Sequence, residues 1–101
     1  MTNLGKAKKM SDRIYTKTVL NEVYVERIAQ QDVWGERDHD PLVWGAILGE
    51  EVGELAQAML LDHEDPSTDY LLYVGTMRKE AIQVAAVAVA FVEYLNRMRT
   101  D

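Results

Sequence analysis

The sequence predicts an all-α fold, a three- to four-helix antiparallel bundle completed by a second subunit. Apolar residues recur at helical spacing through most of the 101 residues. No stretch alternates cleanly at the period of two that is typical of a half-buried strand. Two polar segments rich in turn residues, 35–41 and 62–67, separate three helical stretches. A chain of this length corresponds to one domain.

The first helix is expected from about Ser11 to Val33, with Ser11 or Asp12 as its N-cap. Its apolar face is predicted to comprise Ile14, Thr18, Val25, Ile28 and Ala29. The second helix is expected from about Pro41 to Leu61, because Asp40 is a good N-cap and Pro41 suits the first helical position. The third is expected over about 67–97, where Gly75 is a candidate for a kink or a break.

The third helix predicts a second subunit. From Ala81 to Val92 every residue except Gln83 is apolar, and alanine dominates. A helix that is apolar on all sides is buried on all sides. The two other helices of so small a chain cannot surround it, so we expect a second subunit to cover it and the chain to be an obligate oligomer.

Composition and charge exclude several classes of protein. The chain is 48% hydrophobic and 28% charged, which is globular composition, and it has no cysteine for disulfides, thiolate metal sites or a thiol nucleophile. Its longest uncharged apolar run, Val84 to Val92, is shorter than a bilayer requires, and no secretory signal is recognisable. A net charge of −6 argues against nucleic acid as a partner. We therefore expect a cytoplasmic protein that binds neither membrane nor nucleic acid.

Basic residues are concentrated at the start of the chain. Residues 1–17 carry five basic side chains and one acidic side chain. We expect residues 1–10 to form a flexible basic arm and residues 11–101 to form the helical domain. A solvated, frayed terminus explains the arm. The alternative is an arm that meets an anionic ligand or the acidic body of a neighbouring subunit.

Carboxylates on the second helix lie where apolar residues are expected. On a helical wheel Glu51 falls within the apolar stripe, Glu54 falls at its edge and Glu50 lies further toward solvent. An ionised carboxylate persists in such a place only if it is paired, protonated or bound to metal. The stripe itself consists of Trp44, Ile47, Leu48, Val52, Leu55, Ala58 and Met59.

The third helix repeats this pattern with Glu80 and Gln83, again three residues apart in an apolar surface. The economical explanation is that Glu51, Glu54, Glu80 and Gln83 face one another and share a cation. Oxygen ligands alone favour Mg²⁺, with Mn²⁺ as a second possibility. The alternative is that Glu-x-x-Glu marks an ordinary solvated helix face.

At these residues the chain resembles the MazG-like group of the all-α nucleoside triphosphate pyrophosphohydrolases. The family signature is Glu-Glu-x-x-Glu on one helix and Glu-x-x-Asp on a later one. Here the halves are Glu50-Glu51-Val52-Gly53-Glu54 and Glu80-Ala81-Ile82-Gln83. The resemblance covers roughly residues 27–95, and it departs from the family at Gln83, which stands where the family has Asp.

The resemblance implies Mg²⁺-dependent hydrolysis of a (deoxy)nucleoside triphosphate to the monophosphate and pyrophosphate. It implies that Glu51, Glu54 and Glu80 hold the metal and that Glu50 lies near it or orients water. It also implies a homodimer, or a tetramer built as a dimer of dimers, with each site near a subunit interface. Gln83 either ligates through its amide or through water, or leaves one metal position weakened. Under this resemblance Glu50, Glu51, Glu54 and Glu80 are the candidate catalytic residues.

Four further residues are candidates for nucleotide binding. Trp34, at the end of a helix, could stack on a base, and His39 could contact phosphate or base from the following loop. Arg78 and Lys79 precede Glu80 and could reach phosphate oxygens. The alternatives are an exposed or capping role for His39 and solvated helix charge for Arg78 and Lys79, whereas Trp44 is expected in the core.

Three functions remain open at the level of sequence. The first is a Mg²⁺-dependent nucleotide pyrophosphohydrolase. The second, which Gln83 suggests, is a catalytically weak nucleotide- or metal-binding regulatory oligomer on the same fold. The third is a structural helical oligomer joined by its alanine-rich helix.

Overall fold

The structure is a computed structural model that describes residues 3–35, 38–64 and 69–99, with only the backbone described for 3–12 and 61–64. This part of the chain forms three helices, α1 (Asn3–Trp34), α2 (Pro41–Glu64) and α3 (Tyr70–Met98), and contains no strand. The predicted all-α class is therefore confirmed. Completion by a second subunit stays a prediction.

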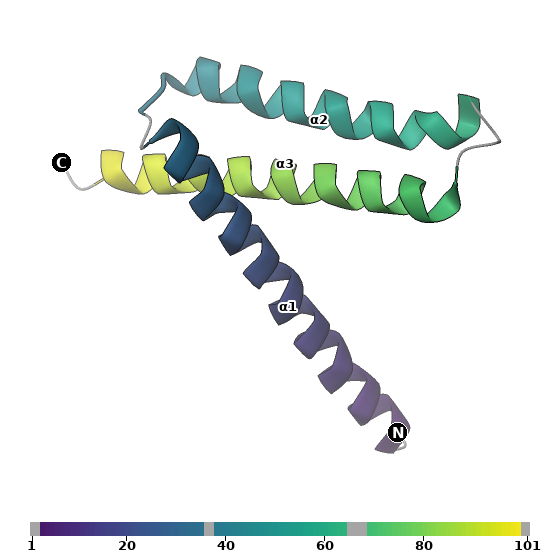
Figure 1. Cartoon of the computed structure of the whole chain (residues 1–101). Coiled ribbons are helices and arrows are strands. Elements are labelled where there is room, and N and C mark those ends of the chain that lie inside the picture. Colours follow the sequence, from purple (N-terminus) through teal and green to yellow (C-terminus); the bar gives the residue numbers. More distant parts are fainter. Residues whose placement is uncertain (1–2, 36–37, 65–68, 100–101) are drawn as a thin grey trace.

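Helix α3 is the central element of the fold. It lies side by side with α2 as an antiparallel hairpin, and α1 crosses it obliquely with its N-terminal half projecting away (Figure 1). Within the described residues, the backbones of α1 and α2 do not approach each other closely. Both outer helices are thus positioned through their packing on α3.

The ends of the helices follow local chemistry. Gly35 ends α1 with a φ of 74°, a left-handed conformation that favours glycine, and its N–H donates to the Gln31 carbonyl at 2.7 Å. Asp40 caps α2 as predicted, since its carboxylate accepts the Leu42 N–H at 2.9 Å. Asp69 caps α3 by accepting the N–H groups of Leu71 and Leu72 at 2.8 and 3.1 Å.

Several predicted helix limits differ from the structure. Helix α1 begins at Asn3 rather than near Ser11, so residues 3–10 are helical, while the division of the chain into an arm and a domain stays a prediction. Helix α3 passes through Gly75 without a break. The predicted start of the third helix at Ser67 lies outside the described residues, as do residues 1–2 of the predicted arm.

The core of the chain lies between α2 and α3, near the end of the hairpin next to the 35–40 loop. Trp44 packs against the rings of Phe91 and Tyr94, with centroids 5.8 and 6.0 Å apart, as its predicted core position requires. The other members of this cluster are Ile47, Leu48, Val87 and Ala90. At the opposite end, the Tyr73 hydroxyl donates to the Met59 carbonyl at 2.8 Å and closes the hairpin.

Polar contacts attach α1 to α3. The Arg27 Nε donates to Glu93 at 2.7 Å, and Arg78 of α3 pairs with Glu22 of α1. Helix α1 buries Val23 between these pairs and Gln30 one turn beyond Arg27. The predicted apolar face of α1 is wrong for the single chain, because Ile14, Val25 and Ile28 are 61%, 58% and 40% exposed. That stripe points away from the only helix that contacts α1 among the described residues.

Helix α3 is not covered on all sides by its own chain. Ala86, Val87, Ala90 and Tyr94 are buried, whereas Ala81, Val89 and Val92 are exposed. By length and composition alone, α3 is apolar enough to cross a membrane. This is weak evidence for a membrane span, because the central helix of a water-soluble fold can have the same composition.

Candidate functional site

Helix α2 places Glu51 on the side that packs toward α3. The Asp40 cap and the buried ring of Trp44 set the rotation of the helix, and Glu51 follows Trp44 by seven residues, close to two turns. Its side chain is half-buried, while that of Glu54, three residues later, is exposed. Glu50 is exposed, as its position on the helical wheel predicted.

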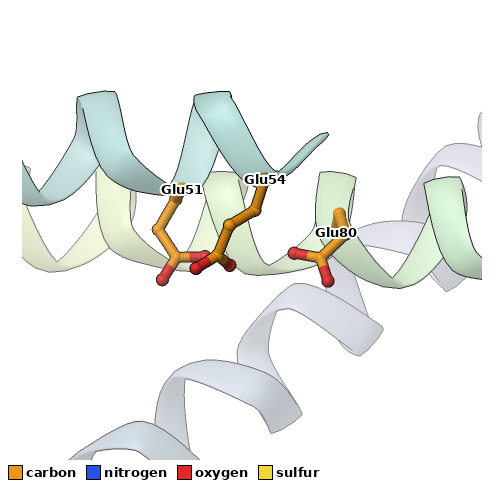
Figure 2. A group of neighbouring side chains, drawn as sticks. All are labelled: Glu51, Glu54 and Glu80. Atoms are coloured by element: carbon orange, nitrogen blue, oxygen red, sulfur yellow. The ribbon is translucent and has the colours of Figure 1, made fainter. Parts of the chain in front are cut away.

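Glu51 and Glu54 from α2 meet Glu80 from α3. One carboxylate oxygen of each lies within 4.8 Å of the others. Figure 2 shows the two α2 side chains next to each other with Glu80 directed toward them from the neighbouring helix. The structure therefore brings together three of the four residues that the sequence assigned to a shared cation.

The negative charges of Glu51, Glu54 and Glu80 repel one another in this cluster. The pKa of Glu51 is raised above its ordinary value of 4.5, first by burial and then by the negative charges of Glu54, Glu80, Glu50 and Glu26. The Oε2 atoms of Glu51 and Glu80 are buried and have no hydrogen-bond partner within the described residues. Two buried oxygens without partners are costly unless a proton or a cation satisfies them.

The donor set fits a hard divalent cation. Three carboxylates from two helices supply oxygen ligands alone, which suits Mg²⁺, Mn²⁺ or Ca²⁺ better than softer metals. Exposed acidic groups are common without a metal, and Glu54 is such a group. The unpartnered oxygens of Glu51 and Glu80 distinguish this cluster from a solvated acidic face.

A pocket of about 300 Å³ adjoins the cluster, and Glu51 belongs to both. All three helices and the 35–40 loop contribute to it. Its walls combine aromatic and apolar side chains with a few polar groups, which is typical of small-molecule sites. The lining residues are Arg27, Gln30, Trp34, Gly35, His39, Trp44, Ile47, Glu50, Glu51, Val87 and Ala90.

The predicted nucleotide-binding residues fall into two groups. Trp34 and His39 line the pocket. The His39 and Trp44 rings form a T-shaped pair, with centroids 5.2 Å apart and an angle of 73° between their planes. Arg78 and Lys79 are exposed and are not among the lining residues, and Arg78 pairs with Glu22. Gln83 is half-buried on α3, one turn beyond Glu80.

Helix α1 supplies site residues that the sequence did not single out. Arg27 and Gln30 line the pocket, and the charge of Glu26 acts on Glu51. These three positions and Val23 share one side of α1 at spacings of three and four residues. The pattern was not detectable because polar residues at helical spacing usually mark a solvated face, and the stronger apolar stripe lies elsewhere on α1.

Comparisons with protein-family models, with curated proteins and with solved structures gave no match. The assignment of a function consequently rests on the site itself and on the motif resemblance.

Proposed function

We propose that this chain is a Mg²⁺-dependent nucleoside triphosphate pyrophosphohydrolase of the MazG-like kind, which releases pyrophosphate and a nucleoside monophosphate. The observation that carries the proposal is the convergence of Glu51, Glu54 and Glu80 beside a pocket with aromatic walls. The cluster suits a metal, and the pocket suits the apolar, planar part of a nucleotide.

In this proposal Glu51, Glu54 and Glu80 hold Mg²⁺ through the oxygens that lie within 4.8 Å of one another. The bound metal supplies neutralisation of the triphosphate charge and activation of water for hydrolysis. Without such neutralisation the acidic cluster would repel the substrate. The exposed carboxylate of Glu50, on the wall of the pocket, is placed to orient a water molecule.

The pocket would hold the base and sugar. Trp34 is 53% exposed and offers a ring for stacking, whereas Trp44 is 7% exposed and mainly forms the floor. Arg27 lines the pocket, and its guanidinium is oriented by the ion pair with Glu93. It gives the pocket a fixed positive charge that suits a phosphate oxygen.

A nucleotide panel tests the proposal. The protein is incubated with each ribo- and deoxyribonucleoside triphosphate and Mg²⁺, and pyrophosphate is converted to phosphate and measured. We expect turnover that requires Mg²⁺ and that falls at least a hundredfold in Glu51→Gln at unchanged helical content. The matched control is Glu22→Gln on α1, whose carboxylate pairs with Arg78 and does not line the pocket, and this variant should retain turnover. Full activity in Glu51→Gln would refute the assignment.

Gln83 favours a second candidate function, a regulatory module that binds nucleotide or metal with little catalysis. An amide oxygen can ligate Mg²⁺ but contributes no charge and cannot act as a base. Calorimetric binding of Mg²⁺ or nucleotide without turnover would identify this case. An intact oligomer that binds neither would leave the structural function.

We further propose that the functional form is a homodimer or a dimer of dimers. The exposed apolar residues of α1 and the uncovered side of α3 support this, since large contiguous apolar patches on a protein surface mark interfaces.

A further inference from the structure

Gln30 is the one polar or charged residue that is buried among the described side chains, and it is 8% exposed. It lies on α1 between Arg27 and Trp34, at spacings of three and four residues, and all three line the pocket. The amide is therefore held inside the molecule at the wall of a cavity rather than in a packed interface.

Among the described residues, the side-chain amide of Gln30 makes one hydrogen bond, and that bond is long. Its Nε2 donates to Glu26 Oε1 at 3.5 Å, the long limit of such a bond. A side-chain amide offers two donor hydrogens and a carbonyl oxygen. Because one long hydrogen bond leaves most of these groups available, a buried glutamine that lines a pocket suits a ligand with complementary donors and acceptors.

The other residues that line the pocket, and its volume, indicate the kind of ligand that would fit. Trp34, His39 and Trp44 provide aromatic surfaces, and Ile47 lies among them. A cavity of about 300 Å³ is at the small end of ligand sites and suits one heteroaromatic ring with its sugar. Arg27 can only donate hydrogen bonds, and the carboxylates can only accept them when ionised.

We infer that Gln30 selects the base of the nucleotide: its amide, buried at the pocket wall between Arg27 and Trp34, pairs with donor and acceptor groups on the edge of the ring. This inference rests on the proposed function for the identity of the ligand as a nucleotide. It assigns to Gln30 specificity and no part in hydrolysis. Because bases differ in the donors and acceptors along their edges, one buried amide suffices to discriminate among them.

A structural function for Gln30 makes a different prediction. If the amide only steadied Glu26 near the acidic cluster, its loss would alter the metal site and would change all nucleotides alike. A ratio between bases separates the two cases, since effects on the metal site cancel in that ratio.

The experiment compares the wild type with Gln30→Met, which keeps an unbranched side chain without the amide, and with Gln30→Glu, which exchanges the donor for an acceptor. The specificity constant kcat/KM is measured for the four deoxynucleoside triphosphates. Binding of the four deoxynucleoside monophosphates is followed in parallel through tryptophan fluorescence with Mg²⁺ present. Circular dichroism and thermal unfolding establish that each variant is folded.

We expect the wild type to favour one base by tenfold or more, and Gln30→Met to reduce that preference to about threefold or less. Gln30→Glu should change the order of preference toward rings that donate an amino hydrogen to the new carboxylate. An unchanged ratio between bases in both variants, or a wild type without preference, would overturn the inference and leave the proposed hydrolysis standing. If the wild type binds nucleotides with a base preference but shows no turnover, and Gln30→Met loses that preference, the role of Gln30 in base selection is supported and the proposed hydrolysis is refuted.

Discussion

At the scale of single residues, the candidate site depends on carboxylates that lie where apolar side chains are expected. The sequence predicted that Glu51 falls within an apolar stripe, and the structure places it half-buried beside Glu54 and Glu80. This part of the site was predictable because a helix fixes the direction of each side chain. Gln30 was not, since a lone glutamine carries no signal of burial.

Removal of one charge should stabilise the metal-free protein. Without a cation, Glu51→Gln relieves repulsion from Glu54 and Glu80, and we expect the Tm to rise by roughly 2–4 °C. Saturating Mg²⁺ should raise the Tm of the wild type by mass action and leave that of the variant nearly unchanged. Thermal unfolding in EDTA and in Mg²⁺ measures both effects, and identical Mg²⁺ shifts would argue against this metal site.

Because the pKa of Glu51 is raised in the folded chain, its effect on the free energy of unfolding should become less favourable as the pH increases. The pKa of Glu51 is higher in the folded chain than its ordinary 4.5, chiefly through burial, so the folded state binds this proton more tightly than the unfolded state. The stabilisation that proton binding at Glu51 gives the folded state is complete below pH 4.5. It is lost as the pH rises through the pKa that Glu51 has in the folded chain. In urea unfolding without metal, the deficit of wild type against Glu51→Gln should therefore shrink as the solution is acidified from pH 7 toward pH 4.5.

Glu22 should behave in the opposite way and serves as the control. Its pKa is lowered by the hydrogen bond and charge of Arg78. The pair stabilises the fold above pH 4.5 and stops doing so as the pH falls through the lowered value. Glu22→Gln should accordingly lose its difference from wild type in acid. The same slope in both variants would contradict the burial of Glu51.

Gln83→Asp should strengthen ion binding or turnover. The substitution restores a carboxylate one helical turn from Glu80, where the motif resemblance expects one. A fourth negative ligand increases the attraction for a divalent cation. A Mg²⁺ titration with activity as the readout checks this, and an unaltered midpoint at unaltered turnover would exclude Gln83 from the ligands.

At the scale of helices, the sequence predicted the start of α2 correctly but not the start of α1 or the continuity of α3. Asp40 and Pro41 set the start of α2 from sequence alone, because a carboxylate cap acts within one turn. The start of α1 at Asn3 and the unbroken course of α3 through Gly75 could not be inferred. Capping residues near Ser11 compete weakly with continued helix, and one glycine costs an α-helix only about 1 kcal/mol.

The cap of α3 offers a test at this scale. Asp69→Ala removes the acceptor for the N–H groups of Leu71 and Leu72 and should lower the free energy of unfolding by about 1 kcal/mol. Asp69→Asn keeps an acceptor and should lose only a few tenths of that. Urea unfolding of the three proteins gives these values, and equal losses in both variants would count against capping.

At the scale of the whole molecule, the single chain is more open than a compact monomer of its size. Its surface of 7910 Å² exceeds the roughly 5,800 Å² of a compact monomer of this mass. Its radius of gyration is 17.2 Å, against about 13 Å for a compact domain. The excess of about 2,000 Å² per chain amounts to about 4,000 Å² for two chains, which lies within the range of total area that obligate dimers bury. The sequence predicted a second subunit from α3 alone, whereas large apolar side chains are exposed on both α1 and α3.

Sedimentation equilibrium should therefore show a dimer or tetramer at micromolar concentration. Leu20→Glu places a charge in the stripe that Leu20, Tyr24 and Ile28 form on α1, and should shift the mass toward monomer with loss of stability. Gln57→Glu adds the same charge at an exposed polar position of α2 and should leave the mass unchanged. A folded wild-type monomer would defeat the expectation.

The arrangement of the three helices divides the site between two pieces of chain. Glu51, Glu54 and Glu80 all belong to the hairpin of α2 and α3, whereas Arg27, Gln30 and Trp34 reach the pocket from α1. Because α1 is anchored only to α3 among the described helices, its sequence can diverge without rearranging the acidic residues. Under the proposed function, ligand choice can thus evolve on α1 while the residues proposed to bind the metal stay unchanged on α2 and α3.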